Sequence, residues 1–369
     1  MKIGELCSYA PKSQIKAGEA IEGAKYMFFT SSADENKRYS DYQFDGEGII
    51  MGTGGNATLH YYSGKYSTST DCVVLLPNEK VRCKYLYYYL KANMNVLEAG
   101  FKGAGLKHTN KKYINDICID NIPDCGKQDK IIYILDKIQD IIDAKNKELK
   151  LLDDLIKARF VELFGDLANP ECIWDKCQFI DACVDYDDIK CGPFGTQLSK
   201  DEYTESGVAV WEIPQINKAF LSTPTHFLAE EKAEQLKAYT IVPGDIAMSR
   251  KGNVGKCALF PESYSDGIIH SDVLRIRVDK KRVNPVFMMC QLHFSGAVTR
   301  QIELISSGAI MAGVNVTKLK QIFVHIPPME LQNKFAHFVN QVDKSKVVVQ
   351  KSLNETQMLF DSLMQKYFG

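Results

Sequence analysis

The sequence lacks the features that mark several large classes of protein. No apolar run reaches the ~18 residues that a membrane-spanning helix needs, and the N-terminal residues lack the apolar core of a signal peptide. The 11 cysteines include no C-x-x-C pair, which argues against a zinc site or a disulfide framework. The formal net charge is only -1, which excludes a general coat of positive charge but not a local basic surface. We therefore expect a reduced, cytoplasmic protein of about two to three domains.

A stretch rich in glycine and lysine, S-R-K-G-N-V-G-K-C-A-L-F at residues 249–260, suggests phosphate binding. A P-loop requires G-x-x-x-x-G-K-[ST] between a strand and a helix. Alignment on Gly255 and Lys256 places Arg250 at the first glycine and Cys257 at the hydroxyl residue. The stretch fails at these two required positions, so a nucleic-acid contact and a tight turn are the interpretations that remain.

The chain contains an internal repeat at an offset of 204 residues. The segments 134–165 and 338–369 both end in Phe-Gly, and further matches precede them at the same offset. These upstream matches are Gln128 with Gln332, Lys130 with Lys334, and Pro123 with Pro327. Such self-similarity indicates a duplicated architecture.

Both repeated segments show the heptad spacing of a helix with one apolar stripe. The stripes are interrupted by Lys145 and Lys346, and Gly165 and Gly369 stand where a helix C-cap would lie. The stripe residues are Leu135, Ile138, Ile142, Leu149, Leu152, Ile156 and Leu163 in the first segment, and Val339, Val342, Val349, Leu353, Phe360, Leu363 and Tyr367 in the second. A helix packed on a globular core is one interpretation, but two matching helices favour an antiparallel coiled coil.

The segments before the two helices also correspond, and short β-branched runs such as residues 71–76 and 273–278 indicate strands. The matches include Ile49–Met51 with Ile246–Met248, Gly55–Asn56 with Gly252–Asn253, Ser69–Asp71 with His270–Asp272, and Asn110 with Asn315. The expected fold class is α+β, with two similar β-rich domains, two long helices and internal pseudo-two-fold symmetry. The expected boundaries are 1–125, 126–165, 166–328 and 329–369.

A duplicated body of this kind suits duplex DNA, which has two-fold axes of its own. A helix of ~36 residues spans ~54 Å, which is longer than one DNA turn of ~34 Å. The helices could therefore hold two domains on separated half-sites.

One known family has similar motifs in the same order. Residues 189–198, I-K-C-G-P-F-G-T-Q-L, resemble its D-G-P-F-G-S-Q-L motif, and residues 203–210 its Y-x-x-x-G-I-P-V motif. Residues 243–256 are similar to G-D-I-L-x-S-R-x-G-x-x-G-K, and residues 326–332 to the I-P-L-P-P-L-x-E-Q that leads into a helix. Over nearly its whole length the chain resembles the specificity (S) subunit of type I restriction-modification systems. The first half departs from this pattern at residues 52–65, where the S-R-x-G element is replaced.

The resemblance implies a DNA reader without catalysis of its own. Each β-rich domain would be a target recognition domain that reads one half of a split, asymmetric site. The paired helices would act as a ruler and as the dock for two adenine-N6 methyltransferase subunits, and motor-nuclease subunits would join for restriction. No cofactor is expected on this chain, because S-adenosylmethionine, ATP and magnesium would belong to the partner subunits.

Most candidate DNA contacts in the second domain lie in or beside two glycine-containing loops, and Ser307 and Asn315 lie in a third segment, residues 306–315. Arginine can pair with guanine and lysine with phosphate, and Gly252 and Gly255 would let the backbone approach a groove. The alternatives are a hairpin with solvated cations and a pure Gly-Pro-Phe-Gly turn. The predicted contacts are Lys190, Phe194, Thr196, Gln197, Lys200, Arg250, Lys251, Asn253, Lys256, Ser307 and Asn315.

The densest basic run of the first domain is F-K-G-A-G-L-K-H-T-N-K-K at residues 101–112. Its counterpart in the second half, residues 306–315, is polar but not basic. Phosphate contact and a solvated loop are both compatible with this run. The predicted contacts of the first domain are Thr53, Asn56, Lys102, Lys107, His108, Asn110 and Lys111.

Two other patterns suggest catalysis or cofactor binding. Residues 49–57 fit G-x-G-x-x-A after a strand, but the dinucleotide fingerprint needs a helix next, and residues 58–64 read as strand and turn. Residues 169–172 do not fit the N-P-P-[YF] tetrad that places a flipped adenine in the methyltransferases of this family. The consecutive tyrosines at 85–89 are expected to be mostly core, because their rings point all round a helix.

Two rival functions stay open at this point. A self-contained nuclease or methyltransferase would need a carboxylate cluster or a cofactor loop, and Asp185, Asp187 and Asp188 have no convincing lysine partner motif. The second rival is a scaffold function, in which the chain is a silent, phase-variable copy of the same gene family.

Overall fold

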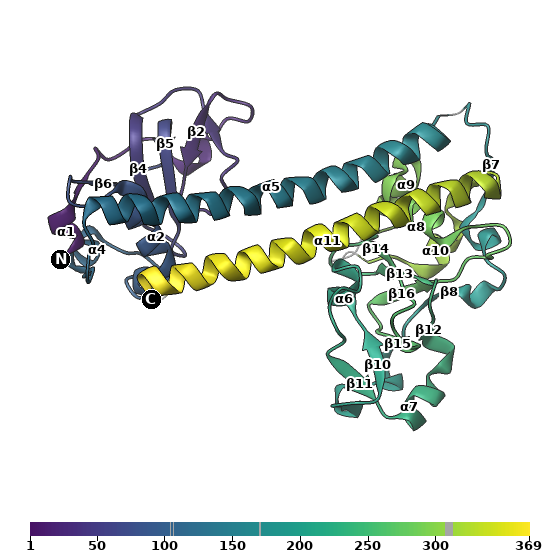
Figure 1. The fold of residues 1–369 in the computed structure, drawn as a ribbon. Helices are drawn as coiled ribbons and strands as arrows, with labels where there is room; N and C mark the ends of the chain where they lie inside the picture. The colour runs from purple at the N-terminus through teal and green to yellow at the C-terminus, as the bar shows by residue number, and fades with distance from the viewer. Residues whose placement is uncertain (104, 106, 170, 307–312) are drawn as a thin grey trace. The chain divides into compact units, whose positions relative to one another are not determined.

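The computed structural model describes residues 1–369 except 104, 106, 170 and 307–312. The chain forms two compact units, whose elements are labelled in Figure 1. The first unit comprises Met1–Lys147 with Val349–Gly369, and the second comprises Glu148–Val348. Each unit therefore contains one β-rich part and one end of each long helix. No helix in the described ranges is long and apolar enough to cross a bilayer.

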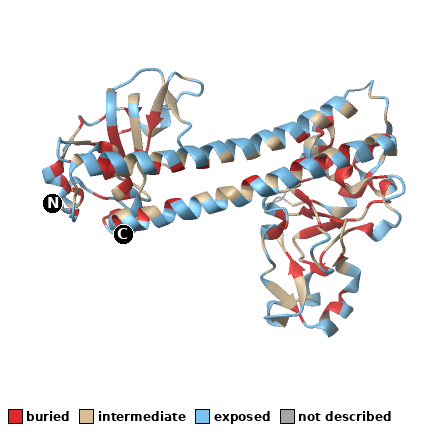
Figure 2. Ribbon diagram, viewed as in Figure 1, coloured by how far each residue is buried: buried red, intermediate tan, exposed pale blue. Residues whose placement is uncertain are grey.

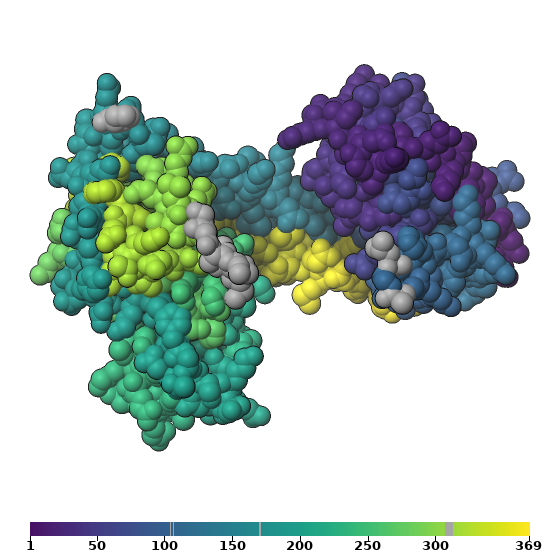
Figure 3. All heavy atoms as spheres, turned by 180° about the vertical axis from the view of Figure 1, so that it is seen from behind, coloured from purple at the N-terminus to yellow at the C-terminus, as the bar shows by residue number. Residues whose placement is uncertain are grey.

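The β-rich part of the first unit is a single six-stranded sheet in the order β1-β6-β4-β5-β2-β3. Neighbouring strands are antiparallel except β2 and β5, which are parallel. On the face seen in Figure 3 the N-terminal residues, in purple, form much of the surface of this unit. Its elements are α1 (Ile3–Leu6), β1 (Cys7–Tyr9), η1 (Ala17–Glu19), β2 (Tyr26–Phe29), β3 (Arg38–Tyr39), β4 (Phe44–Gly52), β5 (Leu59–Thr68), β6 (Cys72–Pro77), α2 (Cys83–Ala92), α3 (Met94–Glu98) and α4 (Lys111–Asp116).

The second unit has three sheets, in the orders β12-β15-β10-β11-β9, β14-β13-β16-β8 and β17-β7. Its strands are β7 (Asp175–Gln178), β8 (Ile189–Cys191), β9 (Tyr203–Thr204), β10 (Val208–Trp211), β11 (His226–Leu228), β12 (Thr240–Ile241), β13 (Ile246–Ser249), β14 (Cys257–Leu259), β15 (Gly267–Ile269), β16 (Val273–Ile276) and β17 (Phe323–Ile326). Its shorter helices are η2 (Phe179–Ala182), η3 (Tyr186–Asp188), η4 (Gly195–Gln197), η5 (Lys200–Glu202), α6 (Ile213–Asn217), α7 (Glu230–Gln235), η6 (Lys237–Tyr239), α8 (Pro285–Phe294), α9 (Gly296–Ser306) and α10 (Val316–Gln321).

The two units share the order and register of their central strands. The order β1-β6-β4-β5 of the first unit corresponds to β8-β16-β13-β14 of the second. Ile49 pairs with Leu75 as Ile246 pairs with Ile276, and Gly52 opposite Cys72 corresponds to Ser249 opposite Val273. In the first unit β2 extends this sheet parallel to β5, whereas in the second unit the parallel pair, β10 and β15, lies in the separate five-stranded sheet. The sequence matches at these strands therefore mark equivalent structural positions.

The expected long helices are present as α5 (Cys125–Phe164) and α11 (Met329–Phe368), each of 40 residues. Buried residues recur at intervals along both, in red in Figure 2. In the first unit the start of α5 packs with the end of α11, through Leu135, Ile138, Ile142, Phe360, Met364 and Phe368. In the second unit the end of α5 packs with the start of α11, through Ile156, Phe160, Phe164, Phe335, Val339 and Val342. Lys346, which interrupts the apolar stripe, forms an ion pair with Asp153 at 2.7 Å.

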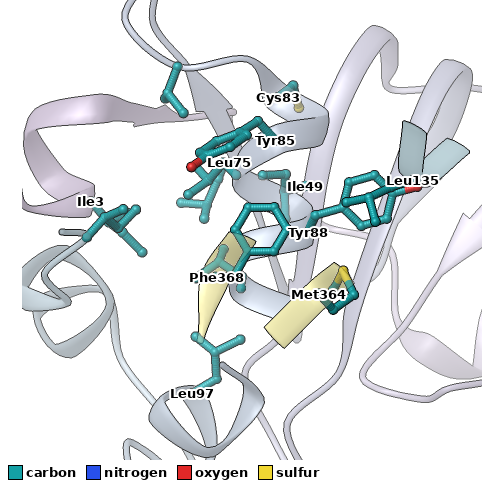
Figure 4. Close-up of a cluster of buried hydrophobic side chains, with 14 of the residues drawn as sticks. Ile3, Ile49, Leu75, Cys83, Tyr85, Tyr88, Leu97, Leu135, Met364 and Phe368 are labelled. Atoms are coloured by element: carbon teal, nitrogen blue, oxygen red, sulfur yellow. The ribbon is translucent and has the colours of Figure 1, made fainter. Parts of the chain in front are cut away.

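The helix ends are anchored in the core of each unit. Figure 4 shows Tyr85 and Tyr88 of α2 in one cluster with Leu135 of α5 and with Met364 and Phe368 of α11. Both tyrosines are buried, as expected from their helical spacing.

A buried glutamine joins the start of each long helix to the β-rich part in the same way. Gln128 is fully buried, accepts a hydrogen bond from the Arg82 N–H at 2.7 Å, and donates to the carbonyls of Lys80 and Pro123 at 3.1 and 2.8 Å. All three bonds recur in the second unit. Gln332 accepts from the Asn284 N–H at 2.8 Å and donates to the carbonyls of Arg282 and Pro327 at 3.1 and 2.7 Å. The repeat seen in the sequence is thus a repeated hydrogen-bond arrangement.

Candidate nucleic-acid interface

The stretch at residues 249–256 is the hairpin that joins β13 to β14. The Ser249 N–H donates to the Lys256 carbonyl at 2.8 Å, and the Gly255 N–H donates back to the Ser249 carbonyl at 3.1 Å. Gly252 and Gly255 have φ values of 68° and 81°, in the left-handed region that glycine adopts at no steric cost. Because a strand and not a helix follows, the stretch has neither the sequence nor the context of a P-loop.

The structure brings the two predicted loops of the second unit together through one side chain. The Arg250 guanidinium lies 4.7 Å from the centre of the Phe194 ring. Its Nε donates to the Val314 carbonyl at 3.2 Å, and both Arg250 and the exposed Phe194 remain accessible. An arginine held in this way keeps its guanidinium organised while leaving donors for a ligand.

Main-chain contacts hold this loop in place. The Arg250 N–H donates to the Asp272 carbonyl at 2.9 Å, and the Arg250 carbonyl accepts from the Val314 N–H at 3.0 Å. Lys251 and Gly313 form an isolated β-bridge. We call these three contacts the loop frame; only the main chain takes part, so its geometry is independent of the side chain at position 250.

The first unit has the same loop frame. The Thr53 N–H donates to the Asp71 carbonyl at 2.8 Å, the Thr53 carbonyl accepts from the Thr109 N–H at 3.0 Å, and Gly54 bridges His108. Thr53 is therefore the structural counterpart of Arg250, and Gly54 that of Lys251. The departure of the first half from the S-R-x-G pattern changes the side chains and leaves the backbone arrangement intact.

The predicted contacts of the first unit gather around its loop frame. His108 exchanges two main-chain hydrogen bonds of 3.0 Å with Lys102, and the Lys107 carbonyl accepts from the Gly55 N–H at 2.9 Å. The side chains of Asn56, Lys102, Lys107 and His108 are exposed. The structure thus places these residues on one accessible surface.

Two predicted contacts have a structural role that explains their repetition. Asn110 caps α4 by accepting from the Tyr113 N–H at 3.0 Å, and Asn315 caps α10 by accepting from the Lys318 N–H at 3.0 Å. Asparagine is among the best N-cap residues. Lys111, the first residue of α4, places its ammonium 4.4 Å from the centre of the Tyr9 ring.

The remaining predicted residues of the second unit differ in their surroundings. Lys190 lies on β8 and forms an ion pair with Asp187 at 2.9 Å, which holds the pKa of that carboxyl below its usual value. Gln197 accepts from the Phe194 N–H and from the Tyr239 hydroxyl, at 3.1 and 3.0 Å. Thr196 and Lys200 are exposed. Ser307 lies outside the described residues.

A hollow of about 310 Å³ lies beside the second loop. Asn253 and Lys256 of the loop line it together with His293 of α8 and Glu303 of α9. Burial lowers the pKa of His293, and the nearby Lys256 lowers it further. Lys251 points to a different partner, since its ammonium pairs with Asp272 at 2.8 Å.

Sequence reasoning missed the residues that position the loops. Asp71 and Asp272 accept the loop-frame hydrogen bonds, and both lie in the repeated segments 69–71 and 270–272, so the repeat was the available signal. Asp245, in the Gly-Asp-Ile motif, is buried and accepts two hydrogen bonds from Arg277 at 2.8 and 2.7 Å. This part of the motif is therefore structural.

The dinucleotide-binding pattern at residues 49–57 is not followed by a helix. β5, Leu59–Thr68, comes next and pairs with β4 along its length. Within the ranges that the structure describes, no three His, Cys, Asp or Glu side chains gather in a group that could hold a metal ion.

Comparisons with known proteins agree with this geometry. The family model described as "Type I restriction modification DNA specificity domain" matches residues 1–153 and 193–356. The MjaVIII specificity subunit of Methanocaldococcus jannaschii is 21% identical over 86% of this chain and 76% of its own length, and the Escherichia coli EcoBI specificity subunit is 19% identical over 95% and 77%. The solved S subunit from M. genitalium has a TM-score of 0.65 at 15% identity, covering 100% of this chain and 95% of the other. The chain belongs to the family of type I restriction-modification DNA specificity subunits.

Proposed function

We propose that this chain reads a bipartite, asymmetric duplex DNA site, with one half-site for each unit. The observation that supports this most strongly is the loop frame, which both units share while carrying different side chains. The loop of the first unit presents Thr53, Gly54, Gly55 and Asn56, and that of the second presents Arg250, Lys251, Gly252 and Asn253. Equal frames with unequal side chains are what a reader of two different half-sites requires.

We infer that α5 and α11 form an antiparallel coiled coil that relates the two β-rich parts by a pseudo-two-fold axis and sets the half-site spacing. The packing of opposite helix ends in each unit supports this arrangement. Both helices also expose large apolar side chains, including Tyr133, Leu151, Val347, Val348 and Met358. We assign these positions to the docking of two methyltransferase subunits, with motor-nuclease subunits joining the assembly in the cytoplasm.

In this proposal the chain contributes recognition and the partner subunits contribute chemistry. The methyltransferase subunits would supply S-adenosylmethionine and adenine-N6 transfer, and the motor-nuclease subunits would supply ATP- and magnesium-dependent cleavage. Incubation of the isolated chain with duplex DNA, magnesium and labelled S-adenosylmethionine should give neither cleavage nor labelled DNA.

The test is selection of bound duplexes from a random library by the chain assembled with its methyltransferase partner. We expect one enriched motif made of two unlike half-sites with a constant spacer. Insertion of one base pair into the spacer should abolish enrichment, because a helical ruler tolerates no change in spacing. Uniform binding to all sequences would refute the proposal.

A further inference from the structure

The first unit has a hollow of about 200 Å³ beside its loop frame. Thr53 of the loop and Thr109 of the adjoining segment form part of its wall, together with Lys12, Thr70 and Lys111. The residues come from four parts of the chain that the sheet and α4 bring together, so the hollow is built by the fold of this unit.

Comparison of the two loop frames explains why there is space here. In the second unit the long side chain of Arg250 turns over Val314, the counterpart of Thr109. In the first unit the shorter Thr53 ends in a hydroxyl that donates to the Asp71 carbonyl at 2.9 Å. The residue at this position of the loop frame therefore has a shorter side chain in the first unit, where the hollow lies.

The charges around this position also differ between the units. By strand register Lys12 corresponds to Gly192, and by helix capping Lys111 corresponds to Val316. The first unit thus carries two cations in the wall of the hollow and none at residues 53–56. Neither lysine forms an ion pair with any residue that the structure describes.

We propose that this hollow seats one backbone phosphodiester of the first half-site; this inference rests on the proposed function. Ammonium and hydroxyl groups are the usual protein partners of phosphate oxygens in DNA complexes. Bidentate reading of adenine uses a side-chain amide, and the amide of Asn110 in this wall has its oxygen engaged in the helix cap. Lysine can also contact guanine, and a duplex with an altered base separates that contact from a phosphate contact. The first unit therefore places its loop on DNA through a phosphate, whereas the second presents an arginine.

The test uses the chain assembled with its methyltransferase partner and titrates cognate duplex between 50 and 200 mM salt. Lys12→Ala and Lys111→Ala should each weaken binding several-fold, and the double variant Lys12→Ala/Lys111→Ala should reduce the salt slope of log affinity by about 1, because one phosphate contact is lost. The loss should be equal for the cognate duplex and for a duplex with one altered base in the first half-site. Lys25→Ala is the matched control, because Lys25 is an exposed lysine of the same unit that lies 5.1 Å from the Tyr26 ring centre.

Neutral methylphosphonates identify the phosphate. One substituted position in the first half-site should weaken the wild-type complex and leave the complex of the double variant Lys12→Ala/Lys111→Ala unchanged. An unchanged salt slope, or a loss that depends on the altered base, would overturn the phosphate seat. Stabilisation of the DNA-free protein by inorganic phosphate, lost in Lys12→Ala, without any methylphosphonate effect would assign the hollow to a free anion and also overturn it. Failure of the proposed function is distinguishable, since wild-type protein would then fail to discriminate between duplexes.

Discussion

Replacing Arg250 with alanine should relax recognition of one half-site and leave the fold intact. The main chain of residue 250 makes the loop-frame hydrogen bonds, and the first unit keeps the same frame with a threonine there. The change removes the stacking on Phe194 and the bond to the Val314 carbonyl, both partly exposed, at a cost of about 1 kcal/mol of stability. A bidentate contact between arginine and guanine provides about 1–3 kcal/mol of discrimination, or about 5- to 150-fold in affinity at 1.4 kcal/mol per factor of ten.

The assay is equilibrium binding to a panel of duplexes that carries every single base change in each half-site. For Arg250→Ala, the ratio of affinities for the preferred base and the other bases should fall about 5- to 150-fold at one or two positions of the second half-site. The base preferences in the first half-site should not change. Thr53→Ala, at the equivalent position of the other unit, is the matched control, and its effects should be confined to the first half-site. Equal loss of discrimination on both halves by Arg250→Ala would refute the reasoning.

Three further changes test the packing. Replacing Gln128 or Gln332 with methionine should lower the free energy of unfolding by about 3 kcal/mol in urea titrations, because three main-chain groups lose their hydrogen bonds to the buried side-chain amide in each case; a loss below 1 kcal/mol would contradict this. Thr109→Val should raise stability by about 1 kcal/mol, since the Thr109 hydroxyl is buried without a partner in the described part of the chain and the second unit has valine there; a lower melting temperature would argue otherwise. Asp245→Ala should lower the free energy of unfolding by about 3 kcal/mol, because Arg277 is left without its carboxylate partner. An unchanged free energy of unfolding would show that the ion pair is dispensable.

The long helices and the duplication could be predicted from the sequence because both leave a signal in side chains. Apolar residues at heptad spacing mark α5 and α11, and Gln128 recurs as Gln332 since each fills the same buried site with all its hydrogen bonds satisfied. The central strands could likewise be aligned, and β4 and β13 proved to share one register.

The loop of the first unit could not be recognised in this way. Its frame consists of main-chain hydrogen bonds, which most residues can make. Thr53 and Gly54 do not match the S-R-x-G motif that contains Arg250 and Lys251. The partners of residue 53 come from segments 18 and 56 positions away, at Asp71 and Thr109. Such contacts depend on the completed sheet, so the hollow beside them became visible only with the fold.

Backbone atoms alone make the loop frame. The position of each loop therefore does not depend on the side chains that the loop presents. In the proposed function, substitutions at the exposed tips would alter which bases are preferred while the main-chain frame stays in place, and a change in one unit would leave the preference of the other unit unchanged. Under that proposal, a single substitution in one loop would give a new combination of half-sites without a compensating change elsewhere in the protein.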